Sequence, residues 1–275
     1  MTSVERVITY THIEQEPGYE SQTQPPENWP ENGQVKVKNL GLVYYHGGPE
    51  ILKDISFTID AHEKIGIVGR TGAGKSSLVS ALFRMPQPSG EVIIDDVISK
   101  DINTQSSRRV MSVISQDPVL FTGSLRMNLD PFEEYEDKEL WEALEEASLK
   151  AMVKTLPQQL REEVKEGGAN FSVGERQLLC LARALLKKTK IIVMDEATAN
   201  VDYKTDRLIQ ETIRTKFKHC TVITIVHRLN TIIDYDRVLV LENGQVVEYD
   251  KPENLLQNKE GYFSKLYHGF DTNKD

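Results

Sequence analysis

A glycine-rich string between an apolar run and a helical pattern constrains the fold of this chain more than any other feature. The string reads GRTGAGKS at residues 69–76, and it follows the apolar run Ile65–Val68. Glycines let the backbone curl so that successive N–H groups point inward at phosphate oxygens, and the N-terminus of the helix expected at 75–83 adds partial positive charge. The string therefore predicts a strand, a phosphate-binding P-loop and a helix, as in an α/β fold.

The residues of this predicted P-loop have distinct roles toward a nucleoside triphosphate. Lys75 would reach the β- and γ-phosphates, and the Ser76 hydroxyl would complete the shell of a Mg²⁺ ion. A chance glycine-rich turn is the alternative, and the flanking strand and helix argue against it. The predicted nucleotide-binding residues here are Gly69, Arg70, Thr71, Gly72, Ala73, Gly74, Lys75, Ser76 and Ser77.

Two consecutive carboxylates follow a second apolar run. Asp195 ends the run Ile191–Met194, and Glu196 comes directly after it. A buried strand would hold Asp195 beside the P-loop as a second Mg²⁺ ligand. Glu196 would then be placed to orient and polarise water for in-line attack on the γ-phosphate. By itself, Glu196 could equally be a capping carboxylate for the next helix.

Composition limits the class of protein and its partners. The chain has 275 residues, 39% of them hydrophobic and 27% charged, which suffices for one large domain or two small ones. Its net charge of −9 argues against a nucleic-acid partner, because phosphate backbones are held by clustered Lys and Arg. The two cysteines, Cys180 and Cys220, are predicted to be reduced and to serve packing. The chain shows no signal peptide and no apolar run of membrane-spanning length, so the fragment itself is expected to be soluble.

The sequence divides into three stretches. Residues 1–33 are polar and proline-rich, and we expect them to be a linker from a preceding domain. Residues 34–265 alternate strands with helices, which favours a mainly parallel sheet with early antiparallel strands and a helical block inserted at about 120–188. A hairpin is predicted about Asn243-Gly244, and residues 266–275 are predicted to be a C-terminal tail.

Taken in order, these motifs resemble those of the nucleotide-binding domain of an ATP-binding cassette (ABC) transporter. The resemblance covers residues 34–265 and implies a P-loop NTPase (RecA-like) core with an antiparallel β subdomain and an inserted α-helical subdomain. It implies ATP and Mg²⁺ as cofactors. It also implies that residues 1–33 lead from a transmembrane domain. Gln116, within the string SQDP at 115–118, resembles the loop glutamine that contacts Mg²⁺ and water and couples to the transmembrane domains.

Three further positions have family roles by the same resemblance. Tyr44 resembles the aromatic residue that stacks on adenine, and His227 resembles the switch histidine. The string ANVD at 199–202 resembles the loop that crosses the seam between two domains. Singly, Tyr44 or its neighbour Tyr45 could be a strand aromatic, Gln116 a loop polar residue and His227 a core histidine. Their joint spacing favours the functional interpretation.

The string FSVGE at 171–175 resembles the family's signature motif, commonly LSGGQ. Ser172 and Gly174 would offer a hydroxyl and a backbone N–H, at a helix N-terminus, to the γ-phosphate of ATP held by a partner domain. Val173 and Glu175 depart from the common pattern. A carboxylate at 175 would be mildly unfavourable near those phosphates unless it points away. FSVG resembles the second nucleotide-binding domain of the C (multidrug-resistance-associated protein) subfamily, and Glu196 implies that this domain has the hydrolytic half-site.

The resemblance implies an ATPase that powers export of organic anions or conjugates. It would work by ATP-driven dimerisation with a second nucleotide-binding domain of the same full-length protein, at the cytoplasmic face of the plasma membrane. The predicted catalytic residues are Glu196, His227 and Gln116, and the predicted metal ligands are Ser76, Gln116 and Asp195. A regulatory domain that senses nucleotide and modulates a channel, with slow hydrolysis, is the alternative. A soluble ABC ATPase is less favoured, because the chain has neither a coiled-coil insertion nor a second cassette. A metabolic P-loop kinase would not need residues 171–177.

Overall fold

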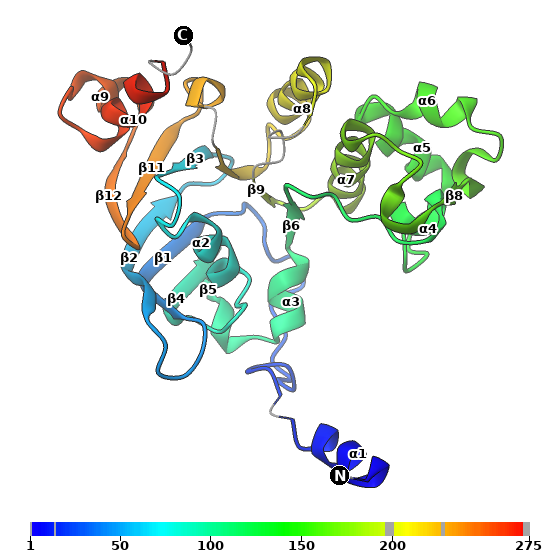
Figure 1. Ribbon diagram of the computed structural model, residues 1–275, viewed down its shortest axis with the longest axis horizontal. Helices are drawn as coiled ribbons and strands as arrows, with labels where there is room; N and C mark the ends of the chain where they lie inside the picture. The colour runs from blue at the N-terminus through cyan, green and yellow to red at the C-terminus, as the bar shows by residue number, and fades with distance from the viewer. Residues whose placement is uncertain (1, 14, 196–200, 227–228, 272–275) are drawn as a thin grey trace.

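Two larger β-sheets and a block of helices make up the part of the chain that the structure describes (Figure 1). The computed structural model describes residues 2–13, 15–195, 201–226 and 229–271. Within these residues no helix is both long and apolar enough to cross a bilayer. Both cysteines are free thiols, as predicted.

The first sheet has six strands, five of them parallel. The apolar runs at its centre are almost wholly buried, as expected for parallel strands covered on both faces. The last strand is antiparallel and closes a hairpin whose turn residues Asn243 and Gly244 have φ of 49° and 79°, the positive values that a two-residue hairpin turn requires. In spatial order the strands are β12 (Gln245–Asp250), β11 (Arg237–Glu242), β3 (Lys64–Val68), β10 (Thr221–Ile225), β9 (Ile191–Asp195) and β6 (Met111–Ile114).

The second sheet is antiparallel and packs with the first around one helix. Helix α2 (Lys75–Leu82) buries Leu78 and Leu82 in a cluster that includes residues of both sheets. Because α2 begins directly after the glycine-rich string, this packing anchors the string to both sheets. The second sheet contains, in spatial order, β2 (Glu50–Ile59), β1 (Val35–Val43), β4 (Ser89–Ile94) and β5 (Val97–Ile98).

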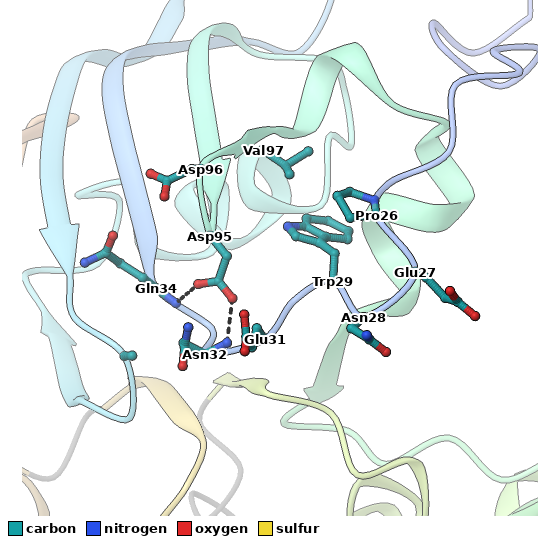
Figure 2. Close-up of a pocket in the computed structure, with 11 residues that line it drawn as sticks. Pro26, Glu27, Asn28, Trp29, Glu31, Asn32, Gln34, Asp95, Asp96 and Val97 are labelled. Carbon is teal, nitrogen blue, oxygen red and sulfur yellow. Dashed lines mark hydrogen bonds between the residues drawn. The ribbon is translucent and has the colours of Figure 1, made fainter.

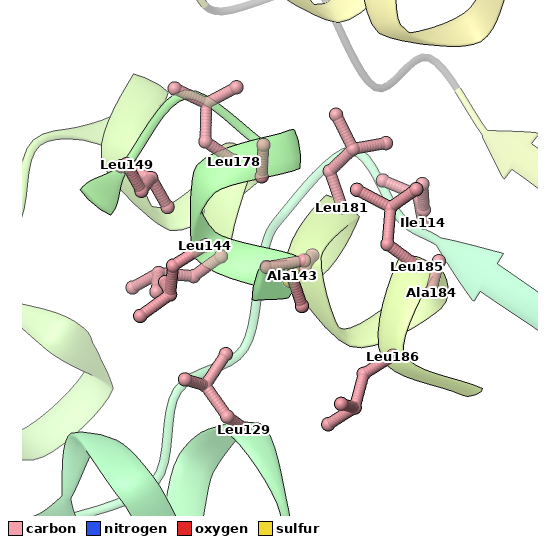
Figure 3. Packing of buried hydrophobic residues seen from close by; sticks show 14 of the residues in the cluster. Ile114, Leu129, Ala143, Leu144, Leu149, Leu178, Leu181, Ala184, Leu185 and Leu186 are labelled. Carbon is pink, nitrogen blue, oxygen red and sulfur yellow. The ribbon is translucent and has the colours of Figure 1, made fainter. Parts of the chain in front are cut away.

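The helical block lies to one side of the parallel sheet and has its own apolar core (Figures 1 and 3). Helix α5 (Asp137–Glu146) buries Leu140, Ala143 and Leu144, which lie three and four residues apart on one helix face. They pack against Leu178 and Leu181 of the longest helix, α7. The block comprises α4 (Leu125–Leu129), α5, α6 (Lys150–Thr155), η2 (Gln159–Arg161), η3 (Glu166–Gly168) and α7 (Val173–Lys187).

One detail differs from the helical period predicted between Leu125 and Leu186. The block contains a short strand, β8 (Glu163–Val164), which pairs with β7 (Gly123–Ser124). A two-residue strand is too short to show an alternating pattern, so periodicity could not reveal it. The remaining elements are α1 (Ser3–Thr11), η1 (Ser99–Asp101), α3 (Thr104–Arg109), α8 (Tyr203–Thr215), η4 (Leu229–Thr231), α9 (Pro252–Gln257) and α10 (Tyr262–Asp271).

The residues before β1 lie against the domain from Glu16 onward. Helix α1 has no buried residue and lies away from the sheets (Figure 1). Glu16 forms an ion pair with Arg108, and Asn103 donates to the carbonyls of Tyr19 and Ser21 at 2.8 and 2.9 Å. The indole N–H of Trp29 donates to the carbonyl of a β4 residue, Ile94, at 2.7 Å. Residues 16–33 are called the N-terminal strap below. That residues 1–33 are a linker, and that 266–275 are a tail, remain predictions.

Asp95 holds the end of the strap at its junction with β1 (Figure 2). Its carboxylate accepts the backbone N–H groups of Asn32, Gly33 and Gln34 at 2.6, 2.9 and 2.7 Å. Burial opposes the charged form, yet these donors together keep the pKa of Asp95 below its usual value. The ionised carboxylate therefore stabilises the folded chain.

We expect Asp95→Asn to lower the free energy of unfolding by about 1–2 kcal/mol, because the amide leaves backbone donors without an acceptor. Asp96→Asn is the matched control, since Asp96 is 88% exposed, pairs with Lys36 on the surface and also has positive φ. It should change stability by less than about 0.5 kcal/mol. Urea denaturation measures both.

The effect of Asp95→Asn should depend on pH. A folded-state pKa below the unfolded value gives stability that is present above the unfolded pKa and is lost as pH falls through the folded pKa. The difference between wild type and Asp95→Asn should therefore be full at pH 7 and shrink on acidification below the ordinary aspartate pKa of about 4. A difference that is the same at pH 7 and at pH 3 would contradict this role.

Candidate functional site

Three predicted site segments follow the carboxyl ends of strands in the parallel sheet. These strand ends form one edge of the sheet. Strand β10 joins two of them in register, because its Ile225 is the partner of both Ile67 in β3 and Asp195 in β9. On the other side of β9, Ile114 of β6 pairs with Met194. The carboxyl ends of these strands therefore meet, and they bring together the P-loop, Asp195 and the segment that carries Gln116 (Figure 1).

The P-loop curls around the amino group of its own lysine. Lys75 is 7% exposed, and its Nζ donates to the carbonyls of Gly69 and Arg70 at 2.9 and 3.1 Å. Gly72 and Gly74 have φ of 81° and 103°, and Gly74 is the N-cap of α2. Such a left-handed backbone turns N–H groups toward the inside of the loop, where an anion would be held. The strand, glycine-rich loop and helix predicted from the sequence are present.

The β11–β12 hairpin, whose strand β11 pairs directly with β3, supports the P-loop. The N–H of Gly244, in the β11–β12 turn, donates to the carbonyl of Ala73 at 3.0 Å. A Cβ on Gly69 would lie 2.3 Å from the carbonyl oxygen of Leu241 in β11. A Cβ on Gly244 would lie 2.0 Å from the carbonyl oxygen of Ile51. These close approaches explain why glycine is needed beneath the P-loop as well as within it.

Tyr44, and not Tyr45, is turned toward the P-loop helix. Its hydroxyl is 3.0 Å from the Ser77 hydroxyl oxygen in the first turn of α2. Tyr44 follows the last residue of β1 and is 47% exposed, whereas Tyr45 is 67% exposed. From the sequence alone, either tyrosine could be simply an aromatic residue of a strand. The contact with Ser77 places Tyr44 beside the P-loop, and its stacking on a base stays a prediction.

Part of the predicted catalytic set lies outside the described residues. Glu196, His227 and residues 199–200 of the predicted seam loop are among these. Asp195 lies at the end of β9 and is half-buried, and Gln116 is half-buried two residues beyond β6. Of the predicted metal and catalytic residues, the structure thus positions Ser76, Asp195 and Gln116 around one edge of the sheet.

The signature residue Ser172 is the N-cap of α7. Its Oγ accepts the N–H of Glu175 at 3.2 Å, and its own N–H donates to the Glu175 carboxylate at 2.8 Å. This reciprocal capping box directs the carboxylate back onto its own helix N-terminus, where the helix dipole favours negative charge. Glu175 departs from the common motif, and the capping box gives a local reason for a carboxylate at this position. The bond from Glu175 uses the Ser172 oxygen as an acceptor, and its O–H can still donate to a ligand.

Gly174 brings the start of α7 against the start of α8. A Cβ at Gly174 would lie 2.8 Å from the Thr205 hydroxyl oxygen. Thr205 in turn donates its hydroxyl and its N–H to Asp202, the N-cap of α8, at 2.7 and 3.0 Å, and the hydroxyl bond lowers the pKa of Asp202. Thr205 thus joins the signature motif to the end of the predicted seam loop. No motif in the sequence indicates Thr205, although Asp202 before the helical pattern of α8 is itself a helix-start signal.

Comparison with known proteins agrees with this geometry. The ABC transporter family model matches residues 52–199, more than half of the chain. Human ATP-binding cassette sub-family C member 4 is 55% identical over 97% of this chain and 20% of that protein. The probable multidrug resistance-associated protein lethal(2)03659 of Drosophila melanogaster is 52% identical over 98% of this chain and 20% of that protein. The structure of a bacterial Atm1-family ABC exporter with ATP bound matches with a TM-score of 0.89 and 29% identity, over 98% of this chain and 47% of that one.

This chain belongs to the ABC transporter family, and it forms the ATP-binding cassette of such a protein. The predicted P-loop NTPase core, antiparallel β subdomain and helical subdomain are confirmed. The resemblance to the C subfamily is also confirmed. Within that subfamily the motifs predict a relative of multidrug-resistance-associated protein 4, which agrees with the identity to member 4. The chain spans about a fifth of the length of these curated relatives.

Two glycine substitutions in the P-loop should differ in their effect on stability. Gly72→Ala meets nothing within 4 Å and should cost about 1–2 kcal/mol for its left-handed backbone. Gly69→Ala adds a collision with the Leu241 carbonyl, so it should lower the free energy of unfolding by about 3 kcal/mol or more. Thermal and urea denaturation compare the two. Equal losses would show that the β11 backbone yields to the new Cβ.

Proposed function

We propose that this chain is the ATP-hydrolysing domain of an ABC exporter, and that it drives transport by closing with a partner nucleotide-binding domain. The observation that carries the proposal is the convergence of the P-loop, Asp195 and the Gln116 segment at one sheet edge. A separate helix N-terminus presents Ser172, and a site for a phosphate of another subunit needs such a group. The subfamily resemblance extends the proposal to organic anions or conjugates as cargo.

ATP is held mainly by backbone and by positive charge. The curled P-loop directs its N–H groups at the phosphates, and Lys75 exchanges its bonds to the Gly69 and Arg70 carbonyls for phosphate oxygens. Tyr44 stacks on adenine from the opposite end of the nucleotide. Glu196, helped by His227, orients the attacking water, so that the O–P bond to the γ-phosphate breaks with ADP as the leaving group and inorganic phosphate as product.

The residues at the sheet edge fit a magnesium ion. Ser76, Asp195 and Gln116 offer a hydroxyl, a carboxylate and an amide oxygen, which are the hard oxygen ligands that Mg²⁺ prefers beside phosphates. When bound, the ion neutralises charge that develops on the β- and γ-phosphate oxygens. The chain's own contribution is to hold these oxygens at the ends of β9 and β6 and at the start of α2.

Contact with transmembrane domains is proposed through the Gln116 region. A hollow of about 250 Å³ lies between β6, the outermost strand of the sheet, and helices α4 and α7, and Phe121 of the segment that follows Gln116 reaches it. Val113, Phe121 and Met127 line it, and they are 46%, 63% and 45% exposed. Exposed apolar side chains gathered in one hollow are typical of a protein–protein contact.

We propose that this domain is the second of two cassettes in the full-length protein, at the cytoplasmic face of the plasma membrane.

The adenine contact can be tested with a pair of tyrosines. Tyr44→Ala should weaken ATP binding roughly 5- to 100-fold, because base–aromatic stacking contributes about 1–3 kcal/mol. Tyr45→Ala is the control for loss of an exposed aromatic ring in the same loop, and it should change the Kd by less than about twofold. Titration calorimetry measures both. A larger loss for Tyr45→Ala would reverse the roles of the two residues.

The rate of ATP hydrolysis tests whether Glu196 is the catalytic carboxylate. Glu196→Gln should reduce ATP hydrolysis by about 10²- to 10⁴-fold, the usual contribution of a general base, with the ATP Kd changed less than about twofold. Glu211→Gln, an exposed carboxylate on α8, should hydrolyse ATP like the wild type. Hydrolysis at the original rate in Glu196→Gln would refute the assignment. In the full-length protein, stimulation of hydrolysis by cargo distinguishes an exporter from a regulatory domain.

A further inference from the structure

The segment that carries Gln116 is held by a side chain of the signature helix. Gln177 in α7 is 1% exposed, and its Nε2 donates to the carbonyl oxygens of Ser115 and Gln116, both at 2.9 Å. Residues 115–121, called the Gln116 loop below, lie between β6 and β7 without helix or strand of their own. Backbone groups in such a loop must find partners elsewhere, and here α7 supplies them.

A second group of bonds holds the other end of the loop. Arg183, also on α7, donates to the carbonyl of Val119 at 2.9 Å and to that of Asn128 at 2.6 Å. The Asn128 side chain accepts the N–H of Phe121 and donates to its carbonyl, both at 2.8 Å. The Gln116 loop is therefore bound to α7 at both ends. Its motion relative to α7 is restricted, while β6 connects it to the parallel sheet.

The same helix begins at the residue offered to the partner's ATP. Ser172 caps α7, and Gln177 lies about one and a half turns further along. The buried face of α7, with Leu178 and Leu181, is packed in the core of the helical block (Figure 3). A helix capped at one end and packed along its length moves as a rigid rod. Displacement of the Gln116 backbone should therefore displace Ser172 as well.

We infer that Gln177 is a positioning residue that couples two ATP sites, the site on this chain where Gln116 acts and the partner's site to which Ser172 is offered. The inference rests on the proposed function, since it takes ATP at the P-loop as the event that moves Gln116. Binding at the first site then changes the position of Ser172 before any partner arrives. At the Gln116 end of the loop the coupling passes through the two bonds of a single buried amide, whereas Arg183 holds the Val119 end.

Substitutions at Gln177 can separate this role from simple packing. Gln177→Met keeps a similar volume and removes both donors, and Gln177→Asn keeps the amide but shortens its reach. The matched control is Gln210→Met, because Gln210 is a half-buried glutamine on α8 and not on α7. Circular dichroism and thermal melting establish that each variant is folded. If Gln177→Met does not fold, Gln177→Asn is used in its place.

The experiment measures amide hydrogen exchange at residues 173–176 with and without ATP, on the 275-residue chain at a concentration where it is monomeric. In the wild type and in Gln210→Met, ATP should change the exchange rate there by about fivefold or more, the usual lower range of coupling between sites. In Gln177→Met, ATP should bind with a Kd within about threefold of the wild type and change that rate by less than about 1.5-fold.

Each outcome tests either the inference or the proposed function on which it rests. A packing role alone would speed exchange in Gln177→Met both with and without ATP, and would leave the response to ATP intact, which would overturn the inference. Absence of an ATP response in the wild type, with ATP bound, would overturn it too. If the wild type does not bind ATP, or hydrolyses it no faster than Glu196→Gln does, the proposed function is refuted instead.

Discussion

Parallel pairing of β3, β10, β9 and β6 is the constraint on which the rest of the structure depends. The strands are held in register by buried backbone bonds, so their carboxyl ends coincide and the segments that follow them must share one edge. The P-loop adds curvature that only glycine permits at Gly69 and Gly74. Asp195 and Gln116 then reach the same region from strands far apart in sequence. The local motifs supply the reactive groups, and strand register brings these groups together at one edge.

The helical block adds a second, separately packed unit to this edge. Its core is continuous from α5 to α7, and the Gln116 loop crosses from the sheet to this core with its carbonyls bound by α7. Ser172 and Gly174 lie at the other end of the same helix, next to Thr205 at the start of α8. The residues proposed to act on the chain's own ATP and those proposed to meet a partner's ATP are therefore joined by short, buried contacts. The proposed closing of two such domains needs such a connection, since only interactions that differ between open and closed states can drive a conformational change.

Most of the fold could be predicted from the sequence, because long apolar runs and helical periods are local signals. The P-loop, the strand before Asp195 and the Asn243-Gly244 hairpin are of this kind, and all three are present. The pair β7–β8 could not be predicted, since two residues are too few for a period. Neither could the attachment of the strap residues Glu16 and Trp29, whose partners are distant in sequence.

The sequence by itself determined which chemistry is available: a phosphate-binding loop, a carboxylate after a buried strand, and a capping serine in a signature motif. These depend on residue types at short, regular spacings. Tertiary structure alone decided that Tyr44 and not Tyr45 faces Ser77, and that Gln177 binds the Gln116 loop. The physical reason is that the direction of a side chain, and the pairing of a buried polar group, are settled by atoms that lie far away along the chain and close in space.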